Sequence, residues 1–337
     1  MKNHNVGFNN SIYLKNQVAA IKKIIGQSRE KLYIEFGGKI INDKHAARVL
    51  PGYDEDAKAK LIKILCHTGE IIFVISAKDI IRGRVRGDFK ITYDKEALRV
   101  LSELKKHQIY VKHVAIAMND KESTKNKKII DLKKILKKMQ ITIYDFYSTK
   151  DYYSTQNDFN DLNSNPFIKT DKKIVIILSP GGGSGKFGIC LSQLYHEMRK
   201  GVSPHYLKFE TFPVHDFPLS HPLNLAYMAA SADFYDQVML DKRHGSATSY
   251  NRDIKNYELL HVLSNNNPRF GKYLKKLSSA TYMGVNKVST GIVNDEIVQR
   301  EAAAEIARRL IRYKFEVANG EEDKKILNRV RKILKLL

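Results

Sequence analysis

The sequence predicts an α/β fold: a doubly wound, mostly parallel, Rossmann-like sheet with a mainly helical C-terminal part. Three observations predict it. Short apolar runs typical of buried strands alternate with stretches of helical periodicity. A glycine-rich loop joins one of these strands to a helix, and from residue 224 onward the pattern is mainly helical.

The first 150 residues contain the clearest alternation. Four short apolar runs predict strands, at 31–36, 71–76, 109–117 and 141–146. Between them, apolar residues recur every three or four positions and predict helices at 54–65, 94–106 and 125–139. We expect residues 1–150 to form an N-terminal α/β lobe.

A polar stretch rich in Asn, Asp, Ser and Tyr, residues 151–172, predicts a linker. We expect residues 173–320 to form a second lobe, with a strand, the glycine-rich loop, a helix at 185–199, a strand at 205–210 and a helical extension. Residues 321–337 predict an amphipathic C-terminal helix. Its apolar stripe needs a cover, either the protein's own core or a second copy in a homo-oligomer.

The formal net charge of +22 suggests a nucleic-acid partner, but its distribution argues against one. The densest basic run, 121–138, has the pattern of an amphipathic surface helix, and no known DNA- or RNA-binding motif accompanies it. No apolar run approaches a membrane span, and the first residues lack the apolar core of a signal peptide. We expect a cytoplasmic protein with no membrane partner. The two cysteines, Cys66 and Cys190, lie far apart and predict neither a disulfide nor a metal site.

The glycine-rich loop predicts an anion site. Its glycines let the backbone turn tightly, and the helix that follows presents its positive end there. We expect a phosphorylated small molecule, such as ATP or another nucleotide, with backbone N–H groups holding the phosphate oxygens and Lys186 neutralising their charge. The candidate ligand-binding residues are Gly181, Gly182, Gly183, Ser184, Gly185 and Lys186.

Two nucleotide interpretations of this loop compete. A magnesium-binding P-loop would need Gly and Ser or Thr where the chain has Pro180 and Phe187, so magnesium would need another ligand such as Ser184. The dinucleotide pattern Gly-x-Gly-x-x-Gly fits Gly183, Gly185 and Gly188, with Glu210 near the usual distance for a ribose contact. An ATP-dependent or other phosphate-handling enzyme and an NAD(P)-type redox protein therefore both stay open. So does a non-enzymatic assembly or nucleic-acid-binding module.

Other polar clusters are weaker candidates, and each has a plain structural alternative. A proline-rich loop carries three side chains that could act as acid and base or bind a metal, or could simply face solvent: His215, Asp216 and His221. A second phosphate could be held by Arg86 and Asp88, which could also form surface ion pairs. A helix start carries ribose- or phosphate-directed side chains that could simply cap it: Asn251, Arg252 and Asp253. Glu35 ends the first strand beside a Gly-Gly pair and could contact the ligand.

Several separate blocks resemble the bacterial family known as domain of unknown function 1846. They are Glu35-Phe36-Gly37-Gly38-Lys39, residues 45–52, 86–89, 91–94, 179–186, 190–197, 208–214 and 221–224, Tyr250-Asn251-Arg252-Asp253 and Met283-Gly284-Val285-Asn286. The resemblance implies no established activity. Some members have been labelled ATP-dependent peptidases, yet this chain has no His-Glu-x-x-His motif and no recognisable nucleophile and base pair. Members of this family also resemble longer chains that carry a further C-terminal domain. The resemblance therefore implies that such a domain, as a separate chain, could be a partner of this protein.

Overall fold

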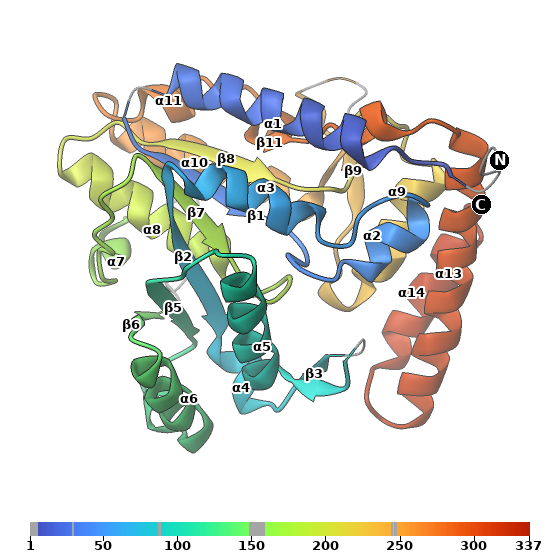
Figure 1. Cartoon of the computed structure of the whole chain (residues 1–337), viewed down its shortest axis with the longest axis horizontal. Helices are drawn as coiled ribbons and strands as arrows, with labels where there is room; N and C mark the ends of the chain where they lie inside the picture. Colours follow the sequence, from blue (N-terminus) through green and yellow to red (C-terminus); the bar gives the residue numbers. More distant parts are fainter. Residues whose placement is uncertain (1–5, 29, 87–88, 148–158, 244, 246–247) are drawn as a thin grey trace.

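The computed structural model describes residues 6–28, 30–86, 89–147, 159–243, 245 and 248–337. Its centre is a seven-stranded sheet in the order β11-β8-β1-β7-β2-β5-β6, in which every neighbouring pair is parallel (Figure 1). The strands are β1 (Leu32–Phe36), β2 (Gly69–Ser76), β5 (His113–Met118), β6 (Thr142–Tyr147), β7 (Ile174–Leu178), β8 (His205–Phe209) and β11 (Gly284–Val285). The predicted α/β fold with a parallel sheet is confirmed.

The chain winds across this sheet in two directions. It passes from β1 through β2 and β5 to β6 at one edge, and then returns to place β7 between β1 and β2. From β7 it continues to β8 and β11 at the opposite edge. Strands from residues 1–150 and from 173–320 are therefore neighbours in one sheet. The division into two lobes joined by residues 151–172 stays a prediction.

Two helical layers cover the sheet, because side chains alternate between its faces along each strand. Leu32 and Ile34 point to one apolar layer, whereas Tyr33 points to the other. The first layer is formed by α1 (Asn10–Gln27), α3 (Ala57–Cys66), α5 (Tyr93–Lys106) and α6 (Lys127–Lys138). The second is formed by α7 (Asn160–Asn163), α8 (Lys186–Arg199), α10 (Asn251–Asn266), α11 (Lys272–Lys275) and α12 (Ala280–Met283).

A third apolar cluster joins helices at one side of the molecule, on the right of Figure 1. Its helices are α2 (Lys44–Val49), α9 (Pro222–Ala230), α13 (Asp295–Ala318) and α14 (Lys324–Leu334). The stripe of α14, including Ile326, Val330 and Ile333, is buried in this cluster. The predicted C-terminal amphipathic helix is thus covered by the protein's own core.

Short elements complete the described part of the chain. They are α4 (Ala77–Ile81), β3 (Val85–Arg86), β4 (Ile91–Thr92), β9 (Val238–Leu240), β10 (Thr248–Tyr250) and the 3-10 turns η1 (Glu122–Lys125), η2 (Ala232–Phe234) and η3 (Val288–Gly291). Among the helices described, none has the length and apolar character that crossing a membrane requires.

Candidate functional site

The glycine-rich loop, residues 179–185, leaves the central strand β7 at the point where the chain reverses its direction across the sheet. In open α/β sheets, ligands bind outside the carboxyl ends of the strands at such a switch point. Gly183 and Gly185 have φ of 71° and 86°, values that favour glycine. A Cβ on Gly185 would also lie 2.9 Å from Ala117 Cβ.

Within the loop, one backbone carbonyl oxygen accepts hydrogen bonds from three side chains, whereas most backbone N–H groups have no acceptor in the described part of the chain. The carbonyl oxygen of Gly181 accepts from Ser179 Oγ at 2.6 Å, Ser184 Oγ at 2.7 Å and Lys186 Nζ at 3.4 Å. By contrast, the backbone N–H groups of Gly181, Gly182, Gly183, Gly185 and Lys186 donate no hydrogen bond to any residue that the structure describes, whereas residues 181–184 form a turn that directs Ser184 N–H to the Gly181 carbonyl. Gly185 caps α8 and Lys186 is its first residue, so their N–H groups are free donors at the positive end of a helix, and those of Gly181, Gly182 and Gly183 lie in the loop just before it.

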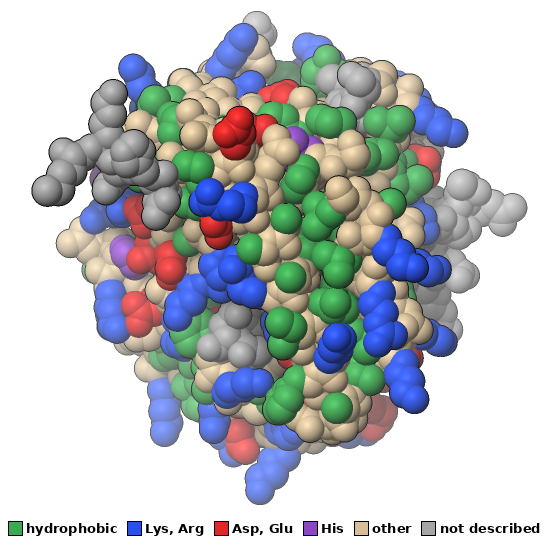
Figure 2. Space-filling model, turned by 90° about the vertical axis from the view of Figure 1, so that its right-hand side faces the viewer, with side chains coloured by type: hydrophobic (Ala, Val, Ile, Leu, Met, Phe, Trp, Pro, Cys, Tyr) green, Lys and Arg blue, Asp and Glu red, His purple; other side chains and the backbone are tan. Residues whose placement is uncertain are grey.

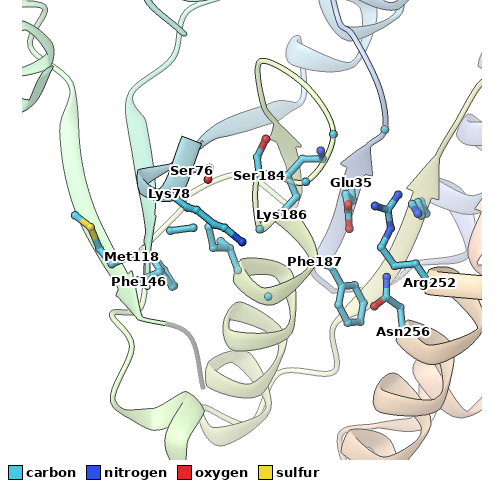
Figure 3. Close-up of a pocket in the computed structure, with 18 of the residues that line it drawn as sticks. Glu35, Ser76, Lys78, Met118, Phe146, Ser184, Lys186, Phe187, Arg252 and Asn256 are labelled. Atoms are coloured by element: carbon cyan, nitrogen blue, oxygen red, sulfur yellow. The ribbon is translucent and has the colours of Figure 1, made fainter. Parts of the chain in front are cut away.

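The loop borders a cavity of about 450 Å³ that runs along the carboxyl ends of five strands (Figure 3). Glu35, Ser76 and Lys208 represent β1, β2 and β8 in its wall. Met118 and Phe146, from β5 and β6, give one end an apolar lining, and Figure 3 places them on the side of Lys78. A cavity of this size holds a small organic ligand.

Two lysines at this cavity differ in their surroundings. Lys186 is 6% exposed, and its ammonium group donates to Ser179 Oγ at 2.9 Å. Burial lowers the pKa of Lys186 to about 8, an effect that the nearby Glu35 carboxylate opposes. Lys78 is exposed and points into the cavity in Figure 3, with no carboxylate partner among the described residues. The structure therefore offers one buried cation within the loop and one free cation opposite it.

A buried ionic cluster forms the other end of the cavity. Lys208 ion-pairs with Asp253 and lies 2.8 Å from Glu210 Oε1, while Arg252 lies 3.2 Å from Asp236 Oδ2. Burial raises the pKa of Glu210 to about 7, although the Lys208 ammonium opposes this rise. A carboxyl group with a pKa near neutrality can exchange protons at physiological pH.

Glu35 and Asn256 also face this end of the cavity. Glu35 Oε2 accepts a hydrogen bond from the Tyr206 hydroxyl at 2.7 Å. Figure 3 shows Glu35 beside Arg252, with Asn256 next to Phe187. Asn256 is 3% exposed, and its Oδ1 has no hydrogen-bond partner among the described residues. A bound ligand would find an unused amide there.

The structure brings some of the predicted residues together and not others. Gly182, Gly183, Ser184, Gly185, Lys186, Glu210 and Arg252 all line the cavity. Gly181 belongs to the same loop, and Asp253 forms an ion pair with Lys208 without lining the cavity itself. Asn251 accepts a hydrogen bond from the Gln237 N–H at 3.0 Å, which is a structural contact at the start of α10. Asp88 lies outside the described residues, as does the side chain of Arg86.

The three acid-base candidates of the proline-rich loop do not line this cavity. His221 caps α9, stacks on Phe217 and lies 3.3 Å from Asp295 Oδ1. Asp216 accepts from Ser289 Oγ at 2.6 Å, and His215 Nε2 lies near Gly284. The structure gives His221 and Asp216 structural partners, and it does not place the set at the loop.

Sequence reasoning missed Lys78, Lys208 and Asn256 as cavity residues. Lys78 had a usable signal, since it lies two residues beyond a predicted strand, where ligand-binding side chains gather in parallel sheets. Lys208 stood out as a charged residue in an otherwise apolar strand. Asn256 gave no such signal, because nothing local links residue 256 to the loop.

Comparisons with known proteins place the chain in a family and assign that family no activity. A family model described as "Domain of unknown function DUF1846, N-terminal" matches residues 6–337. A UPF0371 protein of Clostridium botulinum (strain Alaska E43 / Type E3) is 40% identical over 339 residues, covering 98% of this chain. A UPF0371 protein of Clostridium tetani is 40% identical over 338 residues. The chain spans 66% of the length of each of these relatives.

Proposed function

We propose that this chain, which belongs to the DUF1846 family, binds a phosphorylated small molecule at the loop between β7 and α8. A nucleotide is the favoured ligand, and an ATP-dependent or other phosphate-handling reaction is the favoured activity. One observation carries the proposal. Five backbone N–H groups, those of Gly181, Gly182, Gly183, Gly185 and Lys186, have no acceptor in the described residues, and they lie just before or at a helix N-terminus and at the switch point of the sheet.

The charge of the cavity supports an anionic ligand. Its described wall carries four basic side chains and two acidic ones. Of the basic groups, Lys186 already binds the loop and Lys208 already pairs with two carboxylates, so Lys78 is the cation best placed to meet a phosphate. Lys186 would then act mainly by fixing the loop and by adding positive charge beneath it.

The apolar end of the cavity favours a nucleotide over a bare phosphate. Met118 and Phe146 lie at the ends of β5 and β6, on the side of the cavity where Lys78 enters, and Tyr147 follows Phe146 in the wall. A base could pack on these side chains while its phosphates meet the loop. A small phosphosugar would leave this lining uncovered.

The strand order argues against the dinucleotide alternative. In dinucleotide-binding folds, the acidic residue that contacts the ribose follows the strand next to the glycine-loop strand. Here β1 lies between β7 and β8, so Glu210 is separated from the loop strand by one strand. The acidic residue near the carboxyl end of the neighbouring strand β1 is Glu35, in register with Ile177 of β7.

Glu210 is the favoured acid-base residue for a phosphate-handling reaction. It lines the cavity beside Lys208, and its raised pKa lets it accept a proton from a hydroxyl or water near neutral pH. Magnesium has less support from the loop. Ser184, the ligand expected from the sequence, is 2% exposed and donates its hydroxyl hydrogen to Gly181 O.

Calorimetry with ATP, ADP, NAD and glucose 6-phosphate would test the proposal on the wild type and on Lys78→Ala. Because Lys78 is exposed and has no ion-pair partner in the described part of the chain, its loss should weaken ATP binding by about 1 kcal/mol, roughly fivefold, and reduce the salt dependence of binding. Lys137→Ala is the matched control, since Lys137 is exposed on α6 and lines no part of this cavity.

The outcomes separate the alternatives. Tighter binding of ATP and ADP than of NAD would support the mononucleotide interpretation, and preference for NAD with sensitivity to Glu210→Ala would favour the redox alternative. If no phosphate compound binds the wild type at millimolar concentration, the loop is a structural turn and the proposal fails. Equal effects of Lys78→Ala and Lys137→Ala would remove Lys78 from the site.

A further inference from the structure

A second cavity, of about 560 Å³, lies against the first. Four residues line both: Gly38, Gly182, Glu210 and Arg252. The rest of its wall includes His45 of α2, Tyr227 of α9 and residues of α13. The glycine loop and the ionic cluster therefore separate two chambers, and the C-terminal helices build the second.

Three buried polar atoms in the wall of this second cavity have no partner among the described residues: His45 Nε2, Tyr250 Oη and Glu316 Oε2. Each belongs to a side chain that is at most 5% exposed. Leaving a buried polar atom unpaired is costly, and native proteins pair most of them with protein, water or ligand. The three atoms belong to residues around one cavity and have almost no accessible surface, so a hydrogen-bonding group from outside the chain would reach them after a small shift of the side chains that cover them.

The chemistry of these atoms indicates what they would bind. The Nδ1 atom of His45 lies 3.0 Å from Glu305 Oε1, which can only accept, and 3.3 Å from Arg309 Nη2, which can only donate. We assign the imidazole hydrogen to Nδ1 because the contact with the carboxylate is the shorter one. His45 Nε2 is then an acceptor, like Glu316 Oε2. The Tyr250 hydroxyl can donate or accept. A ligand rich in hydroxyl groups would match all three.

The charges and the aromatic side chains that line the second cavity narrow the class of ligand further. Among its described wall residues, this cavity has seven basic and seven acidic side chains, in contrast to the excess of basic groups in the first cavity. It therefore offers no preference for a second phosphate. Four tyrosines also line it, Tyr93, Tyr227, Tyr250 and Tyr313. Tyrosine combines a flat apolar ring with a polar tip, which suits the alternating C–H and O–H faces of a sugar.

We propose that the second cavity binds a neutral polyhydroxylated molecule, a sugar or cyclic polyol, and presents one of its hydroxyl groups to the first cavity at Gly182, Glu210 and Arg252. The meeting of the two ligands rests on the proposed function of the loop. The binding of the polyol does not, because its contacts come from α2, α10, α13 and the neighbouring β10.

Ligand-observed NMR with D-glucose, myo-inositol, L-serine and inorganic phosphate tests this assignment, followed by titration of whichever probe binds. Tyr250→Phe is the sharpest variant, because it removes only an oxygen that has no partner among the residues that the structure describes. Glu316→Gln replaces the unpartnered Oε2 by an NH2 group and keeps an oxygen for the hydrogen bond from Arg312 Nε at 2.6 Å, although the ion pair with Arg312 loses its negative charge. Each should weaken polyol binding about fivefold to tenfold, whereas Tyr110→Phe, an exposed tyrosine outside both cavities, should not.

Stability separates binding from a structural role. Removing an unpartnered hydroxyl should leave the unfolding midpoint of Tyr250→Phe unchanged or raised. Polyol binding should also survive Lys78→Ala, so failure of the loop proposal would leave this one standing. The inference is overturned if neither glucose nor myo-inositol binds the wild type at tens of millimolar, if only serine or phosphate binds, or if Tyr250→Phe and Glu316→Gln bind as the wild type does.

Discussion

Replacing His45 by glutamine should remove a measurable part of the pH dependence of stability. His45 is 4% exposed, and its ring packs near Tyr227 and Phe212. Burial lowers the pKa of His45 to about 4. The carboxylates of Glu305 and Asp43 oppose this shift, and the Arg309 guanidinium reinforces it. The folded chain therefore keeps this imidazole neutral at pH values where the unfolded chain protonates it.

The sign and size of the effect follow from proton linkage. Between pH 7 and pH 5 the unfolded state binds the additional proton, so the free energy of unfolding falls as the pH falls. The loss begins near the ordinary histidine pKa of about 6.5 and is complete below a pKa of about 4. With these two values, the loss between pH 7 and pH 5 is about 2 kcal/mol.

Urea unfolding at pH 7 and at pH 5 would measure this loss in the free energy of unfolding. Far-ultraviolet circular dichroism is the suitable signal, since the chain has no tryptophan for fluorescence. Other histidines contribute equally to both proteins, so the difference between wild type and His45→Gln isolates this residue. His67→Gln, an exposed histidine, is the matched control and should behave as the wild type does. If wild type and His45→Gln lose the same stability between pH 7 and pH 5, the buried neutral imidazole is refuted.

Three further predictions concern the loop and the ionic cluster. Gly185→Ala should lower the free energy of unfolding by about 1–2 kcal/mol from its positive φ alone, plus a term for the contact with Ala117. Gly320→Ala, with φ of 71° and open space around it, should show only the backbone term, so equal losses would contradict the contact. Lys208→Met should lower the free energy of unfolding in urea by about 3–5 kcal/mol, because it leaves Asp253 and Glu210 buried without a cation. A stability equal to that of the wild type would show that these ion pairs add nothing. Affinity for ATP should fall as the pH rises through the Lys186 pKa of about 8, because the ammonium loses its proton. Calorimetry should find this slope absent in Lys186→Met, and a flat wild-type profile would remove Lys186 from the electrostatics of the site.

The strands and the glycine loop could be predicted because their signals are local. Apolar runs such as 174–178 specify buried strands, and clustered glycines specify a backbone that only glycine adopts easily. The remaining walls could not be predicted in the same way. Asn256 and Glu316 reach the two cavities from helices that follow the loop by about 70 and 130 residues, and only tertiary packing brings them there.

Chemical type alone was a weaker guide than position on the fold. His215, Asp216 and His221 have the side chains of acid-base catalysts, yet the loop that carries them packs against α9 and η3 and away from the cavity. Lys78 was missed because lysine is common on this surface, where basic side chains are scattered among other types on the face shown in Figure 2. Its place just after β2 is what makes it notable.

The central position of β7 has a consequence for how the binding site forms during folding. Strands β1 and β2 flank β7 and have no direct pairing with each other, so the middle of the sheet stays open until a segment more than a hundred residues later arrives. Pairings this distant in sequence form late, because closing the intervening chain costs entropy before any contact is gained. The strand that closes the sheet is also the one that delivers the glycine loop. If the loop binds phosphate as proposed, this capacity is acquired when β7 joins β1 and β2, and a chain that lacks this pairing would not bind the ligand.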